Sequence, residues 1–263
     1  MESSLIAVNP VRPVAPYVGG KRALARRLAE RIAAVPHSLY AEPFVGMGGV
    51  FFRRSTRPSA EVINDISTDV VTLFRILQRH YQSFLDELKW RLSSRAEFER
   101  LMATNPDTLT DLERAARFLY LQRSAFGGKV VGRNFGVTYG SSRFDLTKLV
   151  PMLEEVHERL SGVVIERLPY PDFIRRYDRP GTLFYLDPPY HGSEGYYGPH
   201  FSEADYEALR SLLAATEASW ILSINDTPEI RRIFTGFPTE EVRLGYTLSG
   251  DKVDASELII MSP

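Results

Sequence analysis

Residues 181–190 read GTLFYLDPPY, an apolar run that stops at an aspartate and two consecutive prolines. A short run of aliphatic and aromatic residues bounded by turn residues is typical of a buried strand. Similar apolar runs start at residue 40 and occur at 61–64, 163–168 and 220–226. Segments with helical periodicity lie between these runs. Strands that alternate with helices predict an α/β fold with a mostly parallel sheet.

The middle and the end of the chain depart from this alternation. Residues 80–123 show helical periodicity without a strand, and residues 124–143 contain five glycines, as in an ordered loop or a small hairpin. The sequences EVRLGYTLSG and ELIIMS near the C-terminus read as an antiparallel hairpin. We therefore expect an inserted, mainly helical domain at residues 80–143 within an α/β domain that comprises residues 1–79 and 144–263.

The composition is that of a globular protein, with 263 residues of which 44% are hydrophobic and 25% are charged. The chain has no cysteine, which excludes disulfides, cysteine-bound zinc and a thiolate nucleophile. No apolar run approaches the roughly 18–20 residues of a membrane span, and the N-terminus lacks the pattern of a signal peptide. The five histidines show no metal-binding spacing. We expect a cytoplasmic protein without a metal or a membrane anchor.

The formal net charge of −1 argues against a simple basic nucleic-acid-binding domain, but the charges are unevenly distributed. Residues 117–148 carry six basic side chains against Asp145 alone, interleaved with aromatic residues, whereas residues 186–230 carry eight acidic side chains against one arginine. Basic side chains suit phosphates and aromatic rings suit bases. Residues 117–148 are therefore either a nucleic-acid-binding segment or a solvated surface loop.

Asp187-Pro188-Pro189-Tyr190 directly follows the predicted strand at 182–186. Ligands of open α/β sheets bind at the carboxyl ends of the strands. The prolines restrain the backbone and remove two N–H groups, so the Asp187 carboxylate and the Pro188 carbonyl can each accept one N–H of a planar amine. Tyr190 can stack on the ring that carries the amine. The alternative is an ordinary Asp-Pro-Pro turn.

Two further segments have features of a nucleotide-like site. EPFVGMGG at 42–49 places glycines where a strand turns, and Asp65 follows Gly46 by 19 residues at the end of the next predicted strand. That spacing suits a carboxylate that binds ribose hydroxyls, although the complete GxGxxG pattern is absent and a structural turn is the alternative. GGK at 19–21 precedes a predicted helix, whose N-terminus can hold an anion.

In this order, the motifs resemble the Dam-like (D12 class) DNA adenine-N6 methyltransferase family. The resemblance rests on GGK at 19–21, EPFVGMGG at 42–49, NDIS at 64–67, FLYLQRSAFGGKVVGRNFGV at 118–137, FYLDPPY at 184–190 and KVDASELIIM at 252–261, so it spans nearly the whole chain. Two departures are Tyr17, where the family often has Trp, and LQRSAFGGK, where many members have an Asn-Arg-x-x-x-Asn-Gly pattern. These departures concern the recognition sequence more than the chemistry.

The resemblance implies a Rossmann-like methyltransferase sheet with an inserted target-recognition domain. It further implies an enzyme that transfers a methyl group from S-adenosylmethionine to the N6 amine of a flipped-out adenine in double-stranded DNA. The implied location is the cytoplasm of a prokaryotic or phage-infected cell, and restriction–modification is an implied role. A monomer is expected. The implied catalytic residues are Asp187, Pro188, Pro189 and Tyr190. The implied cofactor-binding residues are Tyr17, Lys21, Glu42, Pro43, Phe44, Gly46, Gly48, Asp65, Asp172, Phe173 and Asp187. The implied DNA-binding residues are Arg123, Ser124, Lys129, Arg133, Asn134 and Arg143.

Three other functions are compatible with these motifs. N4-cytosine DNA methyltransferases use the same kind of amine site, usually with Ser in the place of Asp187. Methyltransferases that act on RNA or on protein amides usually have Asn there. A non-catalytic DNA-binding relative is the third alternative. C5-cytosine methylation is excluded, because it requires a cysteine thiolate and the chain has none.

Overall fold

The computed structural model describes the chain except for residues 1–4, 18–20, 22, 137–141, 193–200 and 249–250. In the described part, a seven-stranded sheet has the order β5-β4-β2-β6-β7-β9-β8, in which β9 runs antiparallel to both of its neighbours and the other pairs are parallel. This confirms the predicted sheet and its C-terminal hairpin. The strands are β2 (Leu39–Glu42), β4 (Ala60–Asn64), β5 (Val164–Glu166), β6 (Thr182–Leu186), β7 (Ser219–Asn225), β8 (Thr239–Leu248) and β9 (Asp251–Met261).

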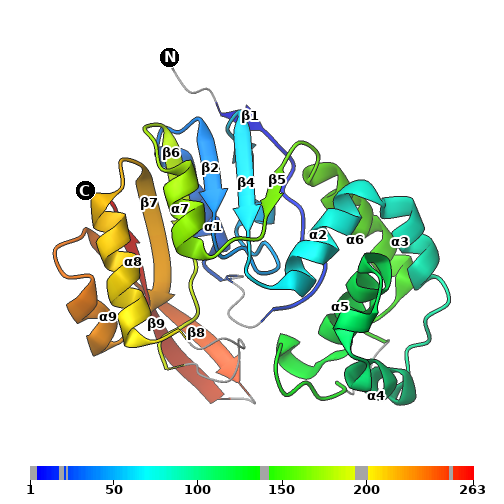
Figure 1. The fold of residues 1–263 in the computed structure, drawn as a ribbon. Helices are drawn as coiled ribbons and strands as arrows, with labels where there is room; N and C mark the ends of the chain where they lie inside the picture. Colours follow the sequence, from blue (N-terminus) through cyan, green and yellow to red (C-terminus); the bar gives the residue numbers. More distant parts are fainter. Residues whose placement is uncertain (1–4, 18–20, 22, 137–141, 193–200, 249–250) are drawn as a thin grey trace.

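Helices cover both faces of this sheet (Figure 1). Along β6, alternate side chains enter two different hydrophobic cores: Leu183 and Tyr185 pack in one, Phe184 and Leu186 in the other. Burial on both faces explains why this strand is continuously apolar in the sequence. The second core is closed by α7 (Tyr170–Tyr177), α8 (Glu203–Ala215) and α9 (Pro228–Ile233), and α1 (Ala25–Ala34) packs in the first.

The first core continues without a break into a helical lobe beside the sheet (Figure 1). Phe84, Phe98 and Leu119 of this lobe belong to the same buried cluster as Ile63 of β4. The segment at 80–143 therefore contains the predicted helices, and they share their core with the sheet. The division of the chain into two domains stays a prediction. The helices of the lobe are α2 (Thr68–Arg79), α3 (Tyr81–Leu88), α4 (Arg95–Ala103), α5 (Asp111–Ser124) and α6 (Leu146–Arg159).

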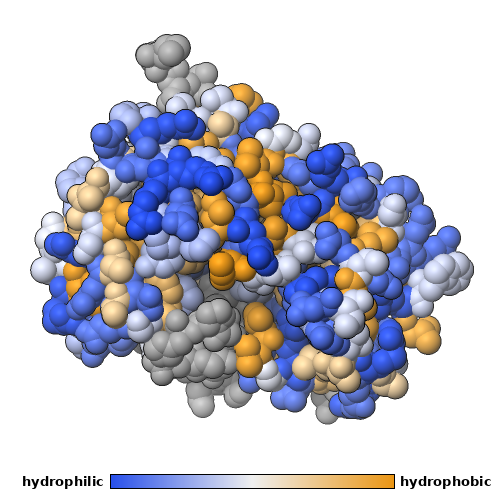
Figure 2. Space-filling model, in the orientation of Figure 1, coloured by the Kyte–Doolittle hydropathy of each residue, from blue (hydrophilic) through white to orange (hydrophobic). Residues whose placement is uncertain are grey.

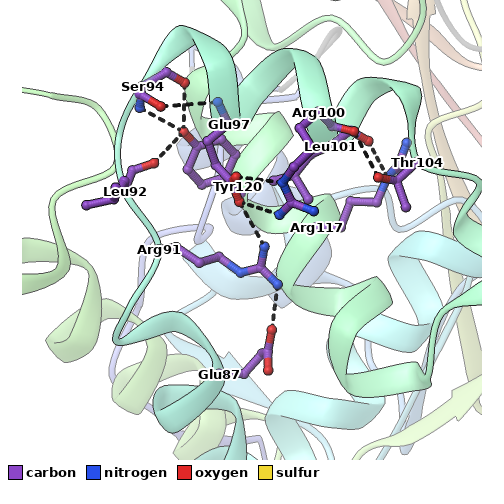
Figure 3. A network of polar contacts seen from close by, with 10 residues as sticks. All are labelled: Glu87, Arg91, Leu92, Ser94, Glu97, Arg100, Leu101, Thr104, Arg117 and Tyr120. Carbon is purple, nitrogen blue, oxygen red and sulfur yellow. Dashed lines mark hydrogen bonds and ion pairs between the residues drawn. The ribbon is translucent and has the colours of Figure 1, made fainter.

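Polar contacts fasten the connection between α3 and α4 to α5 (Figure 3). The hydroxyl of Tyr120 donates to the Leu92 carbonyl at 2.8 Å and accepts from the Ser94 N–H at 3.1 Å. Arg117 donates from Nε to the Leu101 carbonyl at 2.8 Å. These buried bonds hold α5 in place, and α5 leads directly into the glycine-containing loop that borders the site.

A small second sheet was not predicted. It pairs β1 (Ile6–Ala7) antiparallel with β3 (Thr56–Arg57). The glycine-rich stretch forms a compact loop, in which Ala125 and Phe135 make an isolated antiparallel bridge and the Phe126 N–H donates to the Asn134 carbonyl at 2.9 Å. We call residues 124–136 the insert loop.

Candidate active site

A cavity of about 950 Å³ lies at the carboxyl ends of the central strands. Its volume is within the range of small-molecule sites, roughly 300–1,000 Å³. Apolar side chains are exposed over β4 and β5 beside the helical lobe (Figure 2), and Ile66, which follows β4 and lines the cavity, is 56% exposed. Most of the wall comes from the N-terminal segment, the turns after β2 and β4, the connection into α7 and the loop after β6. Single residues from elsewhere complete it, namely Arg123, Val130, Met152, Phe201 and Asp205.

Asp187 and Tyr190 of the loop after β6 contact two charged side chains from other parts of the chain, Lys21 and Glu257. Lys21 Nζ lies 2.8 Å from Asp187 Oδ1 and 3.2 Å from Glu257 Oε2, and it donates to the hydroxyl of Tyr190. The Tyr190 hydroxyl donates to Glu257 Oε1 at 2.7 Å, and Lys21 Nζ lies 4.1 Å from the centre of the Tyr190 ring. We call these four residues, Lys21, Asp187, Tyr190 and Glu257, the Asp187 cluster.

The Asp187 cluster sets the charge state of its central carboxylate. Burial raises the pKa of Asp187 to about 6, against the opposing effect of the Lys21 ammonium, and the negative charge of Glu257 raises it further. At neutral pH the Asp187 carboxyl is therefore largely ionised and can accept a hydrogen bond. Both Lys21 and Asp187 line the cavity, but the side chain of Asp187 is 23% exposed whereas that of Lys21 is 1% exposed, so the aspartate is the more open of the two.

The backbone of the Asp-Pro-Pro-Tyr segment is held from two sides. The Pro189 carbonyl accepts from the hydroxyl of Tyr206 on α8 at 2.5 Å. The side chain of Asn225, at the end of β7, bonds both the N–H and the carbonyl of His191 at 2.9 Å. His191 is thus engaged with β7, and Pro188 and Pro189 line the cavity.

The turn after β2 forms the floor of the cavity. Asp65 accepts from the Gly46 N–H at 2.9 Å and from the Ser67 N–H at 2.8 Å, so one partly buried carboxylate joins the turn to the end of β4. Gly46 has a φ of +50°, and a Cβ there would lie 3.2 Å from the ring of Tyr17. Glycine therefore lets the backbone approach Tyr17 closely. The residues of the expected cofactor site that line the cavity are Tyr17, Lys21, Pro43, Phe44, Gly46, Asp65 and Asp187.

Four residues of the expected cofactor site do not line the cavity. Glu42 is 2% exposed and accepts from the Tyr40 hydroxyl at 2.7 Å, and burial raises its pKa to about 8. Gly48 lies behind the turn, against Phe52. The helical periodicity of α7 turns Phe173 into the core beside Phe184, and the largely exposed Asp172 pairs with Arg175 at 3.0 Å. The wall expected from Asp172 and Phe173 is formed instead by residues 168–171.

The arginines expected to face DNA are bonded to the protein itself. Arg123 donates to the carbonyls of Val14 at 2.6 Å and Arg143 at 2.9 Å. Arg133 donates to the side chain of Gln122 at 2.9 Å, and Arg143 to the Ala125 carbonyl at 3.2 Å. The Arg133 and Arg143 bonds fasten the insert loop to α5 and to the segment that follows the loop, and the Arg123–Val14 bond joins the end of α5 to the N-terminal segment that lines the cavity.

The other three residues of that expected set differ in exposure. Ser124 is 4% exposed, which removes its side chain from the surface. Lys129 is partly buried and Asn134 is exposed. Asn134 is therefore the member of the set whose side chain is most open to solvent.

Sequence reasoning missed Glu257, Tyr206 and Asn225. Glu257 lies in the closing strand and is paired in register with Asn225 of β7, while Leu258, Ile259 and Ile260 beside it are buried. A single carboxylate at the start of a buried apolar run was a signal in KVDASELIIM, because such a charge requires partners.

Neither a metal centre nor a membrane span is found among the described residues. No group of three or more histidines, aspartates or glutamates in that part of the chain has the arrangement of a metal site. The described helices are all too short or too polar to cross a membrane.

Comparison with known proteins gives a family match over most of the chain. The model of the "D12 class N6 adenine-specific DNA methyltransferase" family matches residues 17–247. The type II methyltransferase M.CviBI of Paramecium bursaria Chlorella virus NC1A is 23% identical over 95% of this chain and 99% of its own length. The type II methyltransferase M1.LlaDCHI of Lactococcus lactis subsp. cremoris is 26% identical over 95% of each chain.

More distant likeness is found among solved structures. TrmN from Thermus thermophilus is 13% identical, with a TM-score of 0.44, over 92% of this chain and 49% of that one. The rRNA methyltransferase aviRa from Streptomyces viridochromogenes is 14% identical, with a TM-score of 0.43, over 96% of this chain and 86% of that one.

Proposed function

The chain belongs to the D12 class N6 adenine-specific DNA methyltransferase family, and we propose that Asp187 and the Pro188 carbonyl receive the amine that it methylates. The protein is an adenine-specific, S-adenosylmethionine-dependent DNA methyltransferase. The observation that carries the residue assignment is the ionised, partly exposed Asp187 carboxylate at the wall of the 950 Å³ cavity.

The cavity fits the cofactor because it combines apolar walls with a close backbone approach at Gly46 and a carboxylate at Asp65. S-adenosylmethionine, when bound, supplies an electrophilic methyl group on a positively charged sulfur. We assign its binding to the turn after β2 and to the N-terminal segment, with the connection into α7 in place of Asp172 and Phe173. The residues that would hold it are Tyr17, Lys21, Pro43, Phe44, Gly46 and Asp65, while Asp187, at the edge of this set, receives the amine.

The proposed mechanism requires the target adenine to leave the base stack, because its amine is not accessible to an enzyme within the duplex. Asp187 accepts one N6–H bond and the Pro188 carbonyl accepts the other. These two acceptors draw the nitrogen lone pair out of conjugation with the ring and orient it towards the methyl group. As N6 bonds the methyl group, the bond between that methyl group and the cofactor sulfur would break, and the neutral thioether S-adenosylhomocysteine would leave. The positive charge that develops on N6 is stabilised by the Asp187 carboxylate until one N6 proton is released to solvent. The ring of Tyr190 packs on the extruded base.

Double-stranded DNA is the proposed substrate, contacted by the exposed part of the insert loop. Phe126 is 62% exposed, Val131 is 45% exposed and the side chain of Asn134 is open to solvent. Arg12 is exposed where the N-terminal segment lines the cavity. We assign base contacts to the insert loop and give Arg123, Arg133 and Arg143 the role of holding it.

The names of the relatives support a proposal for the biological setting. Two of them are called type II methyltransferases, which supports a role in restriction–modification. We therefore propose that the enzyme acts as a monomer in the cytoplasm of a prokaryotic or phage-infected cell.

Product analysis tests the proposal. DNA is incubated with the enzyme and S-adenosylmethionine carrying a labelled methyl group, then digested to nucleosides. We expect the label in N6-methyl-2′-deoxyadenosine. Label in N4-methylcytosine would establish the cytosine alternative, and labelled RNA or protein in a competition assay would establish the second alternative. If no label is transferred although the protein binds DNA, the protein would be a non-catalytic relative.

A further inference from the structure

Glu257 is a buried carboxylate that the reaction as described does not use. It lies on β9, is 3% exposed and is followed by three buried aliphatic residues. A carboxylate in such surroundings is costly unless it is paired and hydrogen-bonded. Its partners are therefore the guide to its role.

The two oxygens of Glu257 contact two different members of the Asp187 cluster. Oε1 accepts from the Tyr190 hydroxyl at 2.7 Å, and Oε2 lies 3.2 Å from Lys21 Nζ. Lys21 in turn lies 2.8 Å from Asp187. A residue near the end of the chain thus joins the aromatic ring and the cation that surround Asp187. Glu257 reaches both without lining the cavity itself.

We propose that Glu257 is a positioning residue for methyl transfer, which holds the Tyr190 hydroxyl and the Lys21 ammonium so that ring and cation keep their places around Asp187. The inference rests on the proposed function of Asp187 and Tyr190. Glu257 acts through these neighbours and touches neither the DNA nor the cofactor. The closing strand β9 therefore contributes to the active site as well as to the sheet.

The charge of Glu257 makes this role distinguishable from a purely structural one. The charged and titratable groups that face Asp187 are Lys21, Glu257, Glu42 on β2 and Tyr185 on β6. The negative charge of Glu257 favours the protonated form of Asp187. Loss of that charge lowers the pKa of Asp187, so the acid limb of the kcat–pH profile moves to lower pH even as the maximum rate falls.

The test uses Glu257→Gln in the full chain, with Glu241→Gln as the matched control. Glu241 lies on the neighbouring strand β8, with a side chain 41% exposed, and pairs with Arg231. For Glu257→Gln we expect kcat to fall at least about tenfold, because misplaced catalytic groups lose large factors in rate. S-adenosylmethionine affinity by calorimetry stays within about threefold, because Glu257 does not line the cavity. The acid limb moves to lower pH, and the control matches the wild type.

Tyr190→Phe provides a second, independent variant, because it keeps the ring and removes the hydroxyl that Glu257 holds. We expect kcat to fall in this variant also, and the double variant to lose less than the product of the two single losses, because both disrupt one contact. A folded Glu257→Gln enzyme with kcat within twofold of wild type and an unmoved acid limb would overturn the proposal, as would full kcat in Tyr190→Phe. A wild-type enzyme that makes no N6-methyladenine would instead overturn the proposed function.

Discussion

The Asp187 cluster and the insert loop both place charged side chains beside the cavity, and they direct those charges differently. In the Asp187 cluster, Lys21 and Glu257 are buried and Asp187 is partly exposed to the cavity. At the insert loop, the guanidinium groups of Arg133 in the loop and of Arg123 at the end of α5 donate to protein acceptors instead. The position of the Asp187 carboxylate is fixed by the buried strand β6, which it directly follows. A charge in a glycine-containing loop goes wherever acceptors are available, including the carbonyls of the loop itself.

Loss of Lys21 should have the largest effect. Lys21→Met leaves the partly exposed Asp187 carboxylate beside the buried Glu257 carboxylate without their shared cation, so we expect kcat to fall by about 100-fold or more. Because Lys21 lowers the pKa of Asp187, the acid limb of the remaining activity should move to higher pH. Stopped-flow or steady-state rates between pH 5 and 9 measure both. An unchanged acid limb would show that Lys21 does not control Asp187.

Loss of Arg123 should affect stability more than DNA binding. Arg123→Ala removes two bonds from a charged donor to backbone carbonyls, so we expect about 2 kcal/mol less free energy of unfolding. The salt dependence of DNA affinity should stay close to that of the wild type, with the exposed Arg179→Ala as the control. If the slope of log affinity against log salt fell by about one instead, Arg123 would be a phosphate contact.

Two glycines with nearly the same positive φ allow the cost of backbone strain to be measured separately from the cost of side-chain crowding. Gly48 has a φ of +70° and Gly127 a φ of +69°, but an added Cβ lies 2.4 Å from the Phe52 ring at Gly48 and meets nothing within 4 Å at Gly127. We expect Gly127→Ala to cost about 1 kcal/mol of unfolding free energy and Gly48→Ala about 1 kcal/mol more. Urea unfolding measures the difference. Equal losses would mean that Phe52 moves aside freely.

The pH dependence of the wild-type enzyme follows from Asp187. Its pKa is about 6, and only the ionised form accepts the amine hydrogen bond. We therefore expect kcat to be constant above about pH 7 and to fall about tenfold per pH unit well below pH 6. DNA and cofactor affinities should be measured at the same pH values. A flat profile down to pH 5 would mean that methyl transfer does not need the ionised carboxylate.

The parts of the molecule that could be predicted are those determined locally. The strand–Asp-Pro-Pro-Tyr segment and the turn that ends at Gly46 occupy contiguous residues, and Asp65 follows the next strand, so their placement at one edge of the sheet follows from the alternation of elements. Lys21 was expected at the cofactor, but its contact with Tyr190 joins residues 169 positions apart and could not be read from the pattern. The Tyr190–Glu257 contact spans 67 positions and was missed for the same reason.

Other expected site residues lie near the cavity in the chain, but the directions of their side chains could not be predicted. Asp172 and Phe173 are close to the cavity in the chain, but the first turn of α7 directs one to solvent and the other into the core. Arg123 lines the cavity, yet it and the two arginines that follow it in the chain, Arg133 and Arg143, donate to acceptors of the protein itself. Composition predicts that a segment is basic, and only the fold decides which acceptors those cations meet.

Asp187→Ala tests the central claim most directly, because it removes the proposed acceptor of the amine. Transfer of labelled methyl to DNA should be abolished, while S-adenosylmethionine affinity by calorimetry and thermal stability stay close to those of the wild type. Asp107→Ala, at a side chain 78% exposed on the helical lobe, is the control and should keep full activity. Full methylation by the folded Asp187→Ala enzyme would contradict the account.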